Sequence, residues 1–593
     1  MTELDTLLIR VEKPARYIGG EYNSIIKEEA ALRWALCFPD VYEIGMSHLG
    51  SRILYHILNA LPETACERVF APWPDMEAAL REAGLPLFSL ETKRPLKSFD
   101  ILGFSLLYEM GYTNILAMLD LAGIPLRAAD RGEDMPLVVA GGPCACNPMP
   151  VAPFFDAILV GDGEELAPAC SEALRRAKAA GLSRSETLRE LAALDGVLAP
   201  ALAGERSAPV VRRIVKDLNA VPFTGRPVVP YLGIVHDRVA LEVMRGCTRG
   251  CRFCQAGYIY RPLRERDCDA LLRTAAEQVA CTGYDEVSLL SLSTGDYSGL
   301  HRLLPGIMTD MEKKRVSVSL PSLRVDAKLR EDFRVMRSVR KAGLTFAPEA
   351  GTQRLRDVIN KNVTEEDILS AAADAFSAGW STVKLYFMLG LPTETDEDIL
   401  GIAALSKKVA ALFYARPKQA RGKGLRLTVS VSTFVPKPFT AFQWCAQLQP
   451  EEIRRRQALL RQALKGARGV QLNCHYSDLS VLEAAFSRGD ARLAGVLESA
   501  FRLGCRFDSW SEHFKPALWE RAFAENGLGA SDFAGRVYAL DEPLPWDGLD
   551  MLVTKRYLQK EYARAMAGET TPDCRTRCNG CFGKDHADAC SLS

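Results

Sequence analysis

Short apolar runs alternate with segments of helical periodicity over the first third of the chain. The runs have the length of strands and lie at 32–38, 67–72, 101–107, 137–140 and 157–160. The segments between them space apolar residues three and four apart, as amphipathic helices do, and lie at 47–61, 73–83, 111–123 and from 164 onward. A repeated strand–helix order predicts a parallel sheet covered on both faces. We therefore expect a doubly wound, Rossmann-like domain at 31–200, after a lead-in at 1–30.

The same alternation returns beyond residues 201–230, whose prolines predict a linker. The expected strands begin near 239 and continue at 286–291, 315–320, 343–347, 382–388 and 426–433. About six strands in this order favour a partial (β/α)6 barrel at 231–440, with its site at the carboxyl ends of the strands. Aromatic and leucine positions at helical spacing then predict a mainly helical domain at 441–570. A cysteine-rich tail follows at 571–593, and the whole chain is of the α/β class.

Composition excludes some partners and leaves one open. The chain holds 74 basic and 74 acidic residues, so no overall field recruits nucleic acid or a membrane surface. Apolar runs stay short of the ~18 residues that a membrane span needs, and the acidic start lacks a signal-peptide pattern. Seventeen cysteines without such a signal predict a reducing, cytoplasmic location. The seven basic residues from Lys407 to Arg426 fit either a solvated loop or a phosphate-rich substrate such as RNA.

Three cysteines stand close together in the segment at 244–257. Cys247, Cys251 and Cys254 are separated by three and then two residues. Three thiolates on a glycine-containing loop can bind three irons of one cuboidal iron–sulfur cluster and leave the fourth iron open. A structural zinc site needs a fourth ligand nearby, and Cys268 is fourteen residues on, so a zinc knuckle is the weaker alternative. Positive charge suits an anionic cluster, and the segment carries Arg245, Arg249 and Arg252.

This loop resembles that of the radical S-adenosylmethionine (SAM) superfamily, in which an aromatic residue, here Phe253, precedes the last cysteine. The resemblance implies a 4Fe–4S cluster on the three cysteines and SAM bound to the open iron. It also implies that one electron, from a reductant protein of the flavodoxin or ferredoxin type, cleaves SAM to a 5′-deoxyadenosyl radical. The three cysteines are thus the expected catalytic centre.

The ends of the barrel strands resemble SAM-binding segments of the same superfamily. Charged residues after a strand are more often ordinary surface residues, but these segments match in order along the chain. Arg324 resembles a partner of the methionyl carboxylate, and Glu349 stands where superfamily members contact the ribose. The residues expected to contact SAM are Phe253, Ser293, Gly295, Ser322, Arg324, Glu349 and Lys384.

The first domain resembles the cobalamin-binding domain that precedes the radical SAM barrel in one subclass, chiefly at 138–148 and 156–165. Ligands of doubly wound sheets bind at the carboxyl ends of the strands. The Asp-x-His-x-x-Gly signature is absent around His48, so the resemblance implies cobalamin without a protein histidine on cobalt. A domain that binds nothing and only organises the substrate is the alternative. The expected cobalamin contacts are Tyr42, Gly45, Tyr108, Gly141, Gly142, Pro143, Cys144, Gly161 and Glu164.

A second cysteine set closes the chain. Cys574, Cys578 and Cys581 repeat the spacing of the first set, and Cys590 can supply a fourth thiolate, with His586 as a possible replacement for one of them. Four ligands predict a closed site that holds zinc or a second 4Fe–4S cluster. An unliganded thiol-rich tail is the alternative.

The resemblance extends over nearly the whole chain and implies radical chemistry. Our first hypothesis is a transferase that moves a methyl group from cobalamin to an unactivated carbon of an unknown substrate, with RNA or a ribosomal component as one candidate. A second is methylthio transfer, in which the tail cluster supplies sulfur. A third is an iron–sulfur or ribosome-associated binding protein without catalysis.

Overall fold

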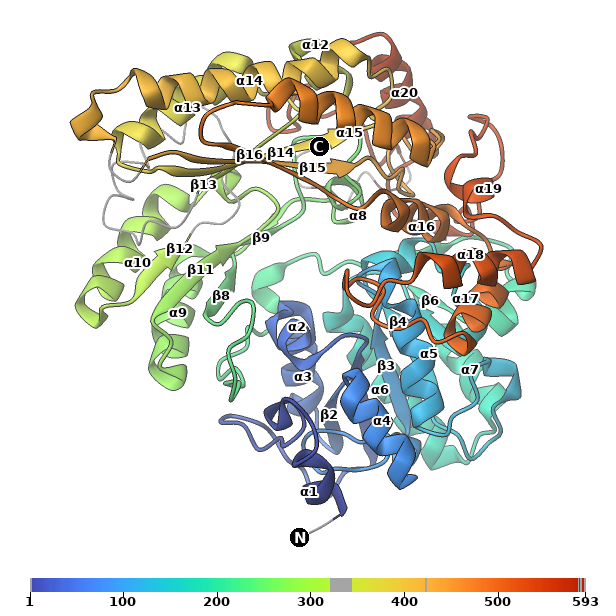
Figure 1. The fold of residues 1–593 in the computed structure, drawn as a ribbon. Coiled ribbons are helices and arrows are strands. Elements are labelled where there is room, and N and C mark those ends of the chain that lie inside the picture. The colour runs from blue at the N-terminus through green and yellow to red at the C-terminus, as the bar shows by residue number, and fades with distance from the viewer. Residues whose placement is uncertain (1–2, 320–343, 422–423, 585, 587–588, 591–593) are drawn as a thin grey trace.

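The computed structural model describes residues 3–319, 344–421, 424–584, 586 and 589–590. It has the expected α/β class and contains a doubly wound sheet, a barrel-like region and a helical region that bridges the two (Figure 1). The predictions made for Ser322 and Arg324 lie outside the described residues. No helix in the described ranges is long and apolar enough to cross a membrane.

The N-terminal sheet has the strand order β2-β1-β3-β4-β5-β6. Its strands are β1 Leu32–Phe38, β2 Thr64–Phe70, β3 Ile101–Ser105, β4 Leu137–Gly141, β5 Ala157–Leu159 and β6 Val197–Leu198. The first five are parallel, as predicted, whereas β6 joins the edge antiparallel to β5. The β6 strand has only two residues, too few to produce a recognisable alternation in the sequence.

Helices cover both faces of this sheet. They are α2 Tyr42–Ser47, α3 Leu49–Ala60, α4 Pro74–Ala83, α5 Tyr112–Leu121, α6 Gly163–Ala180 and α7 Arg184–Ala192. Successive side chains of a strand point to opposite faces, so Ala35 and Cys37 of β1 pack in the core shared with α4 and α5. Trp34 and Leu36 pack in the core shared with α3 and α6. Both faces are therefore apolar, and ligands reach the sheet only at the ends of its strands.

The middle of the chain forms two parallel sheets that face each other (Figure 1). One contains β8 Val239–Glu242, β11 Glu286–Leu290 and β12 Ser317–Ser319, and the other contains β13 Leu344–Glu349, β14 Thr382–Leu389, β15 Arg426–Thr433 and β16 Val470–Cys474. The six strands expected for the barrel are present. The β16 strand pairs in parallel with β15, so the sheet continues beyond residue 440.

Helices lie on the outside of these sheets. They are α9 Cys268–Thr282, α10 Leu300–Lys314, α12 Gln353–Val358, α13 Glu365–Ser377, α14 Asp396–Ala415 and α15 Pro450–Leu464. In β14, Val383, Leu385 and Phe387 belong to the core beneath α13 and α14. Because sides alternate along a strand, Lys384 and Tyr386 lie on the opposite, inner face.

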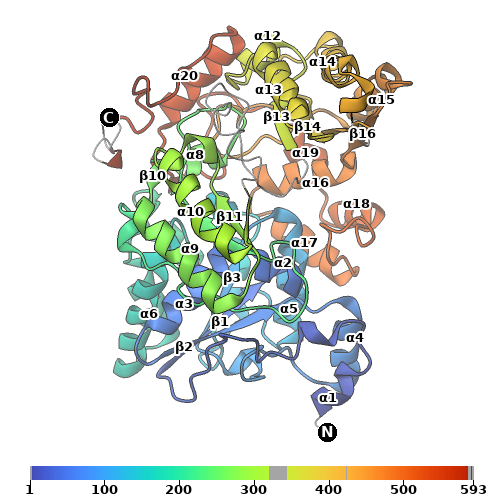
Figure 2. The ribbon, with the colours of Figure 1, turned by 90° about the vertical axis from the view of Figure 1, so that its left-hand side faces the viewer.

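The last third of the chain joins the other two parts. Its elements are α16 Ser477–Arg488, α17 Leu493–Arg502, α18 Pro516–Glu525, α19 Ala530–Ala534, β17 Leu549–Asp550 and α20 Lys555–Met566. Phe486 of α16 meets Tyr112 of α5 edge to face, with ring centroids 6.0 Å apart. The β17 strand pairs with β7, Val210–Val211, inside the segment predicted as a linker. Figure 2 shows this last third against both the N-terminal domain and the barrel.

Candidate functional site

A tight turn positions the first cysteine loop between β9, Met244–Arg245, and α8, Ala256–Ile259. Gly246 has a φ of 92°, and a Cβ there would lie 2.4 Å from the carbonyl oxygen of Pro262. Only glycine fits this position, because a side chain would be strained by the backbone angle and would meet backbone atoms. The loop is therefore held in one shape by its own chain.

The three thiols of this loop lie close enough to affect one another. Burial, and then the neighbouring Cys251, raise the pKa of the Cys254 thiol to about 12, and burial also raises the pKa of Cys247. In the described part of the chain, no three Cys, His, Asp or Glu side chains are grouped to hold a metal ion. Ligands of a single zinc must converge at ~2.3 Å from it, whereas each thiolate of a cuboidal cluster binds a different iron. Three thiols on one loop suit a cluster in which each of them binds a different iron.

Carboxylates hold the three arginines of the loop. The pairs are Arg245 with Glu164 (2.5 Å), Arg249 with Asp296, and Arg252 with Glu561 (3.2 Å). The sequence suggested that these charges balance an anionic cluster, but each is already paired with a carboxylate. Their structural effect is to fasten the loop to the N-terminal domain, to the end of β11 and to α20.

Two of the expected SAM contacts flank Arg249. The hydroxyl of Ser293 donates to Asp296 (2.6 Å), the carboxylate that pairs with Arg249. A Cβ built on Gly295 would have no neighbour within 4 Å, so the backbone is open there. Phe253 packs instead against the small apolar core that contains Phe434. Ser293 and Gly295 therefore lie beside the cluster loop.

Glu349 and Lys384 belong to strands β13 and β14 of the four-stranded sheet. Glu349 ends β13 with a φ of +67°, unusual for a residue with a side chain, and its carboxylate accepts from the Lys361 ammonium (3.1 Å). The charge of Lys361 also opposes the rise in the pKa of Cys254 that burial causes. Lys384 places its ammonium 4.4 Å from the centroid of the Tyr386 ring. Sequence reasoning missed Lys361, because a lysine after a helix carries no motif.

A cavity of about 440 Å³ separates the strand ends of the N-terminal sheet from the cluster side of the barrel. Its size lies within the range of ~300–1,000 Å³ usual for ligand sites. The barrel contributes Glu242, Arg245 and Ser291 to its wall, among others. From the predicted cobalamin contacts, the wall includes Gly141, Gly142, Pro143, Gly161 and Glu164.

The other four predicted cobalamin contacts do not line this cavity. Tyr42 is buried and donates to Glu21 (2.9 Å), and Gly45 is packed against the Phe70 ring. Tyr108 donates to Glu483 of α16 (3.0 Å), and Cys144 is buried, which raises the pKa of its thiol. These are packing and interdomain contacts that a motif alone does not distinguish from ligand contacts.

Two glycines of the cavity are required by the protein itself. A Cβ on Gly142 would lie 2.7 Å from the carbonyl oxygen of Leu106, and one on Gly161 would lie 2.0 Å from that of Arg213. Both also have positive φ, 125° and 129°. Close approach of neighbouring backbone therefore explains these two glycines.

His48 also lines the cavity, although no motif marked it. Its Nδ1 accepts from the backbone N–H of Ser51 (3.1 Å) and so caps α3. Burial lowers the pKa of His48 to about 4, so the ring is neutral near pH 7. Because Nδ1 is an acceptor, the proton of the neutral ring is on Nε2. That nitrogen can donate a hydrogen bond, but it has no free lone pair for a metal.

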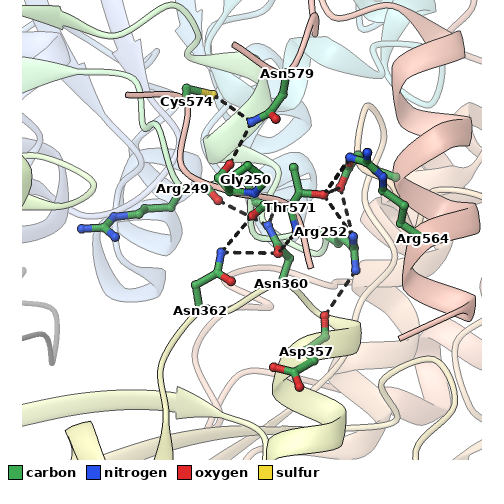
Figure 3. Close-up of polar contacts among 12 residues, drawn as sticks. Arg249, Gly250, Arg252, Asp357, Asn360, Asn362, Arg564, Thr571, Cys574 and Asn579 are labelled. Atoms are coloured by element: carbon green, nitrogen blue, oxygen red, sulfur yellow. Dashed lines mark hydrogen bonds and ion pairs between the residues drawn. The ribbon is translucent and has the colours of Figure 1, made fainter. Parts of the chain in front are cut away.

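The second cysteine set lies directly against the first loop (Figure 3). The backbone N–H of Cys574 donates to the carbonyl of Thr248 (3.1 Å), and the Thr248 hydroxyl donates to Asp573 (2.9 Å). Cys581 is buried, whereas Cys578 is exposed. His586, considered as a fourth ligand, is 2.8 Å from the carboxylate of Asp550.

Comparison with known proteins identifies two matching regions. Residues 50–200 match the model "Radical SAM proteins, N-terminal", and residues 241–405 match "Radical SAM superfamily". An uncharacterized protein of Methanocaldococcus jannaschii is 30% identical over 466 residues, which are 78% of this chain and 90% of that protein. The ribosomal protein uS12 methylthiotransferase of Desulforudis audaxviator is 24% identical over 262 residues, 40% of this chain and 55% of that enzyme.

Solved structures show distant similarity. The cobalamin-dependent SAM radical enzyme OxsB, with aqua-cobalamin and SAM bound, is 12% identical with a TM-score of 0.48, over 90% of this chain and 79% of that one. The radical SAM methyltransferase TsrM of Kitasatospora setae, with cobalamin and a 4Fe–4S cluster bound, is 13% identical with a TM-score of 0.46, over 67% and 74%. Both family models, the long match to the Methanocaldococcus jannaschii protein and the cysteine loop at the barrel agree. This chain therefore belongs to the radical SAM superfamily.

Proposed function

We propose that this radical SAM enzyme transfers a methyl group from cobalamin to an unactivated carbon, with RNA or a ribosomal component as one candidate substrate class. The observation that carries the proposal is the cavity between the N-terminal strand ends and the barrel wall at Glu242, Arg245 and Ser291. A cofactor bound there would lie between the doubly wound domain and the side of the barrel that bears the cysteine loop. Such a place suits a group that must meet both the radical and the substrate.

The chain supplies residues that could bind the cluster and both ends of SAM. When bound, the cluster and SAM supply a 5′-deoxyadenosyl radical, and cobalamin supplies the methyl group. Cys247, Cys251 and Cys254 would hold three irons. Ser293 would orient the amino acid part of SAM, and Glu349, fixed by Lys361, would accept from the ribose hydroxyls.

The cavity wall fits a corrinoid that takes no histidine from the protein. Trp34, Leu36 and Leu54 provide apolar surface for a flat ring, and Ser51 and Ser105 provide polar groups. His48 keeps a proton on Nε2 while its Nδ1 caps α3, so binding cobalt would require loss of that proton. The neutral ring can instead donate a hydrogen bond from Nε2.

The test uses full-length protein purified without oxygen and supplied with iron, sulfide and hydroxocobalamin. We expect a corrinoid that stays bound through gel filtration, recorded by its visible spectrum, and 5′-deoxyadenosine formed from SAM. Ser105→Trp, which fills the cavity, should lose the corrinoid and keep its iron. The matched control is Ser98→Trp, because Ser98 is exposed and does not line the cavity. Iron-loaded wild type that retains no corrinoid would rule out the cobalamin step.

The substrate is sought in cells with and without this gene. Mass spectrometry of RNA and ribosomal proteins should find a methyl group that disappears with the gene and returns with the wild-type copy. Complementation with Cys247→Ala should not restore it. A methyl group that this variant restores equally well would not be a product of radical chemistry here.

A second candidate is methylthio transfer. Sequence similarity to the methylthiotransferase of Desulforudis audaxviator favours it. So does similarity to a threonylcarbamoyladenosine tRNA methylthiotransferase of Bacillus subtilis, which is 28% identical over 114 residues. In this scheme a tail cluster with an open iron supplies sulfur. The same mass spectrometry distinguishes the candidates, because a methylthio group adds sulfur and a methyl group does not.

A further inference from the structure

Arg261 lies behind the first cysteine loop, just after α8. Its side chain is 3% exposed, and its Nε donates to the carbonyl of Gly257 (2.9 Å). The guanidinium carbon lies 5.0 Å from the Tyr258 ring centroid and 5.8 Å from that of Tyr557. Two aromatic rings and one backbone bond therefore fix the orientation of this charge.

The two terminal nitrogens of Arg261 are buried and make no hydrogen bond of ordinary distance and angle among the described residues, although the Tyr557 hydroxyl interacts with the guanidinium. No carboxylate in the described ranges is within ion-pair distance of it. Arg245 and Arg252, which precede it on the same stretch of chain, are both paired with glutamates. A buried charge without an anion is strongly unfavourable. An anion bound beside the buried guanidinium would therefore be stabilised by it.

Cysteines of both sets surround that place. On one side, Nη2 of Arg261 is 3.4 Å from the position that a Cβ on Gly250 would take, inside the first loop. On the other, burial raises the pKa of Cys574, and Arg261 is the largest opposing influence. Cys581 is a further neighbour of both Cys574 and Arg261.

Hydrogen bonds hold the two sets in contact. Asn360 is fully buried, its amide donates to the carbonyl of Gly250 (3.1 Å), and its oxygen accepts from the N–H of Thr571 (2.8 Å) (Figure 3). Three residues after Thr571, the backbone hydrogen bond from Cys574 to Thr248 adds a second connection. Asn360 thus connects the backbone before the second set to the backbone of the first.

We propose that the tail cysteines bind a second iron–sulfur cluster beside the first loop, and that Arg261 is the counter-charge for its thiolates and sulfides. A cluster with cysteine ligands is anionic, and N–H groups near its sulfurs stabilise it. This inference rests on the tail and Arg261 alone, and it holds whichever group the enzyme transfers.

Iron counting tests the site without any measurement of activity. Protein reconstituted without oxygen should bind about eight irons per chain as wild type and about four as Cys574→Ala/Cys581→Ala. Cys247→Ala/Cys251→Ala should also bind about four, with a different Mössbauer spectrum. Cys474→Ala, a half-buried cysteine of β16 in neither set, is the control and should keep all its iron.

Because substitutions at a buried cysteine can disturb folding, the exposed Cys578 provides a second test. Cys578→Ala should lose tail iron at unchanged melting temperature. Wild-type iron content in both tail variants would overturn the proposal. Zinc in place of iron on the tail, found by elemental analysis after anaerobic reconstitution, would overturn it as well.

The role of Arg261 has its own readout. Arg261→Met should release tail iron to a chelator roughly 10–100-fold faster and change the electron paramagnetic resonance of the reduced tail cluster. Arg261→Lys, which keeps the charge, should recover part of that retention. Arg577→Met, which removes an exposed arginine of the same tail, is the matched control. Equal iron release from Arg261→Met and wild type would show that Arg261 is not the counter-charge.

Discussion

The two cysteine sets share the same spacing but have different surroundings. The first loop is built into the core: Gly246 fits only as glycine, and Arg252 beside the cysteines is fully buried. The tail set reaches the surface, with Cys578 exposed, although Cys581 packs in the core and the backbone of Cys574 is hydrogen-bonded to the first loop. Equal spacing can therefore provide one rigid centre and one centre that depends on its neighbour.

The largest difference is expected from loss of one cysteine in each set. Cys251→Ser removes a proposed ligand of the cluster that activates SAM, so 5′-deoxyadenosine formation should fall more than ~100-fold. Cys578→Ser in the tail should leave at least a tenth of the wild-type rate of SAM cleavage. Chromatography of 5′-deoxyadenosine measures both. Equal loss in the two variants would mean that the tail is part of the SAM-cleaving centre.

The buried pair behind the first loop should matter next. Glu561 is 1% exposed at its side chain and holds both Arg252 and the Thr571 hydroxyl. Glu561→Gln leaves the Arg252 charge buried without a carboxylate and should lower the free energy of unfolding by about 3 kcal/mol. Urea denaturation measures this free energy of unfolding. Glu525→Gln, from an exposed pair with Arg521, should change it by about 0.5 kcal/mol or less.

A matched pair of glycines tests the rigidity of the two loops. Gly246→Ala brings a Cβ within 2.4 Å of backbone at positive φ. It should lower the free energy of unfolding, measured by urea denaturation, by about 2–4 kcal/mol. Gly580→Ala, between Cys578 and Cys581, has a φ of 68° but no neighbour within 4 Å. It should cost only about 1–2 kcal/mol, the ordinary penalty of that backbone conformation. Similar costs at both sites would contradict the contrast drawn between a packed loop and an open one.

The smallest expected effect is kinetic. A chelator should remove tail iron about ten-fold faster than iron of the first loop, because exposed ligands open more often than packed ones. Mössbauer spectra taken during chelation distinguish the two sets. Loss of both sets at one rate would show that they open together, as a single unit.

Much of the architecture could be predicted because it follows from local periodicity. The five parallel strands of the first sheet and the six of the barrel each appear as apolar runs. The first sheet formed as expected, whereas the barrel strands lie in two parallel sheets among the described residues. The antiparallel β6 and the strand β16 were missed as members of their sheets, since two residues or an alternating polar strand carry little signal. The residues of the candidate site likewise include some that sequence could predict and some that it could not. The cysteine loop has a spacing that sequence alone displays, whereas His48, Lys361 and Arg261 have none.

The sequence by itself determined that three thiolates stand on a glycine-bearing loop, that a doubly wound domain precedes this loop, that parallel barrel strands follow it and that a second thiolate set closes the chain. Spacing and periodicity are local properties, so they are visible without a structure. Only the tertiary structure decided that Cys574 lies on Thr248, that Arg261 is buried between the two sets without an anion, and that Tyr108 and Cys144 face packing contacts instead of the cavity. These facts depend on segments hundreds of residues apart, and their positions are fixed by core packing and buried hydrogen bonds.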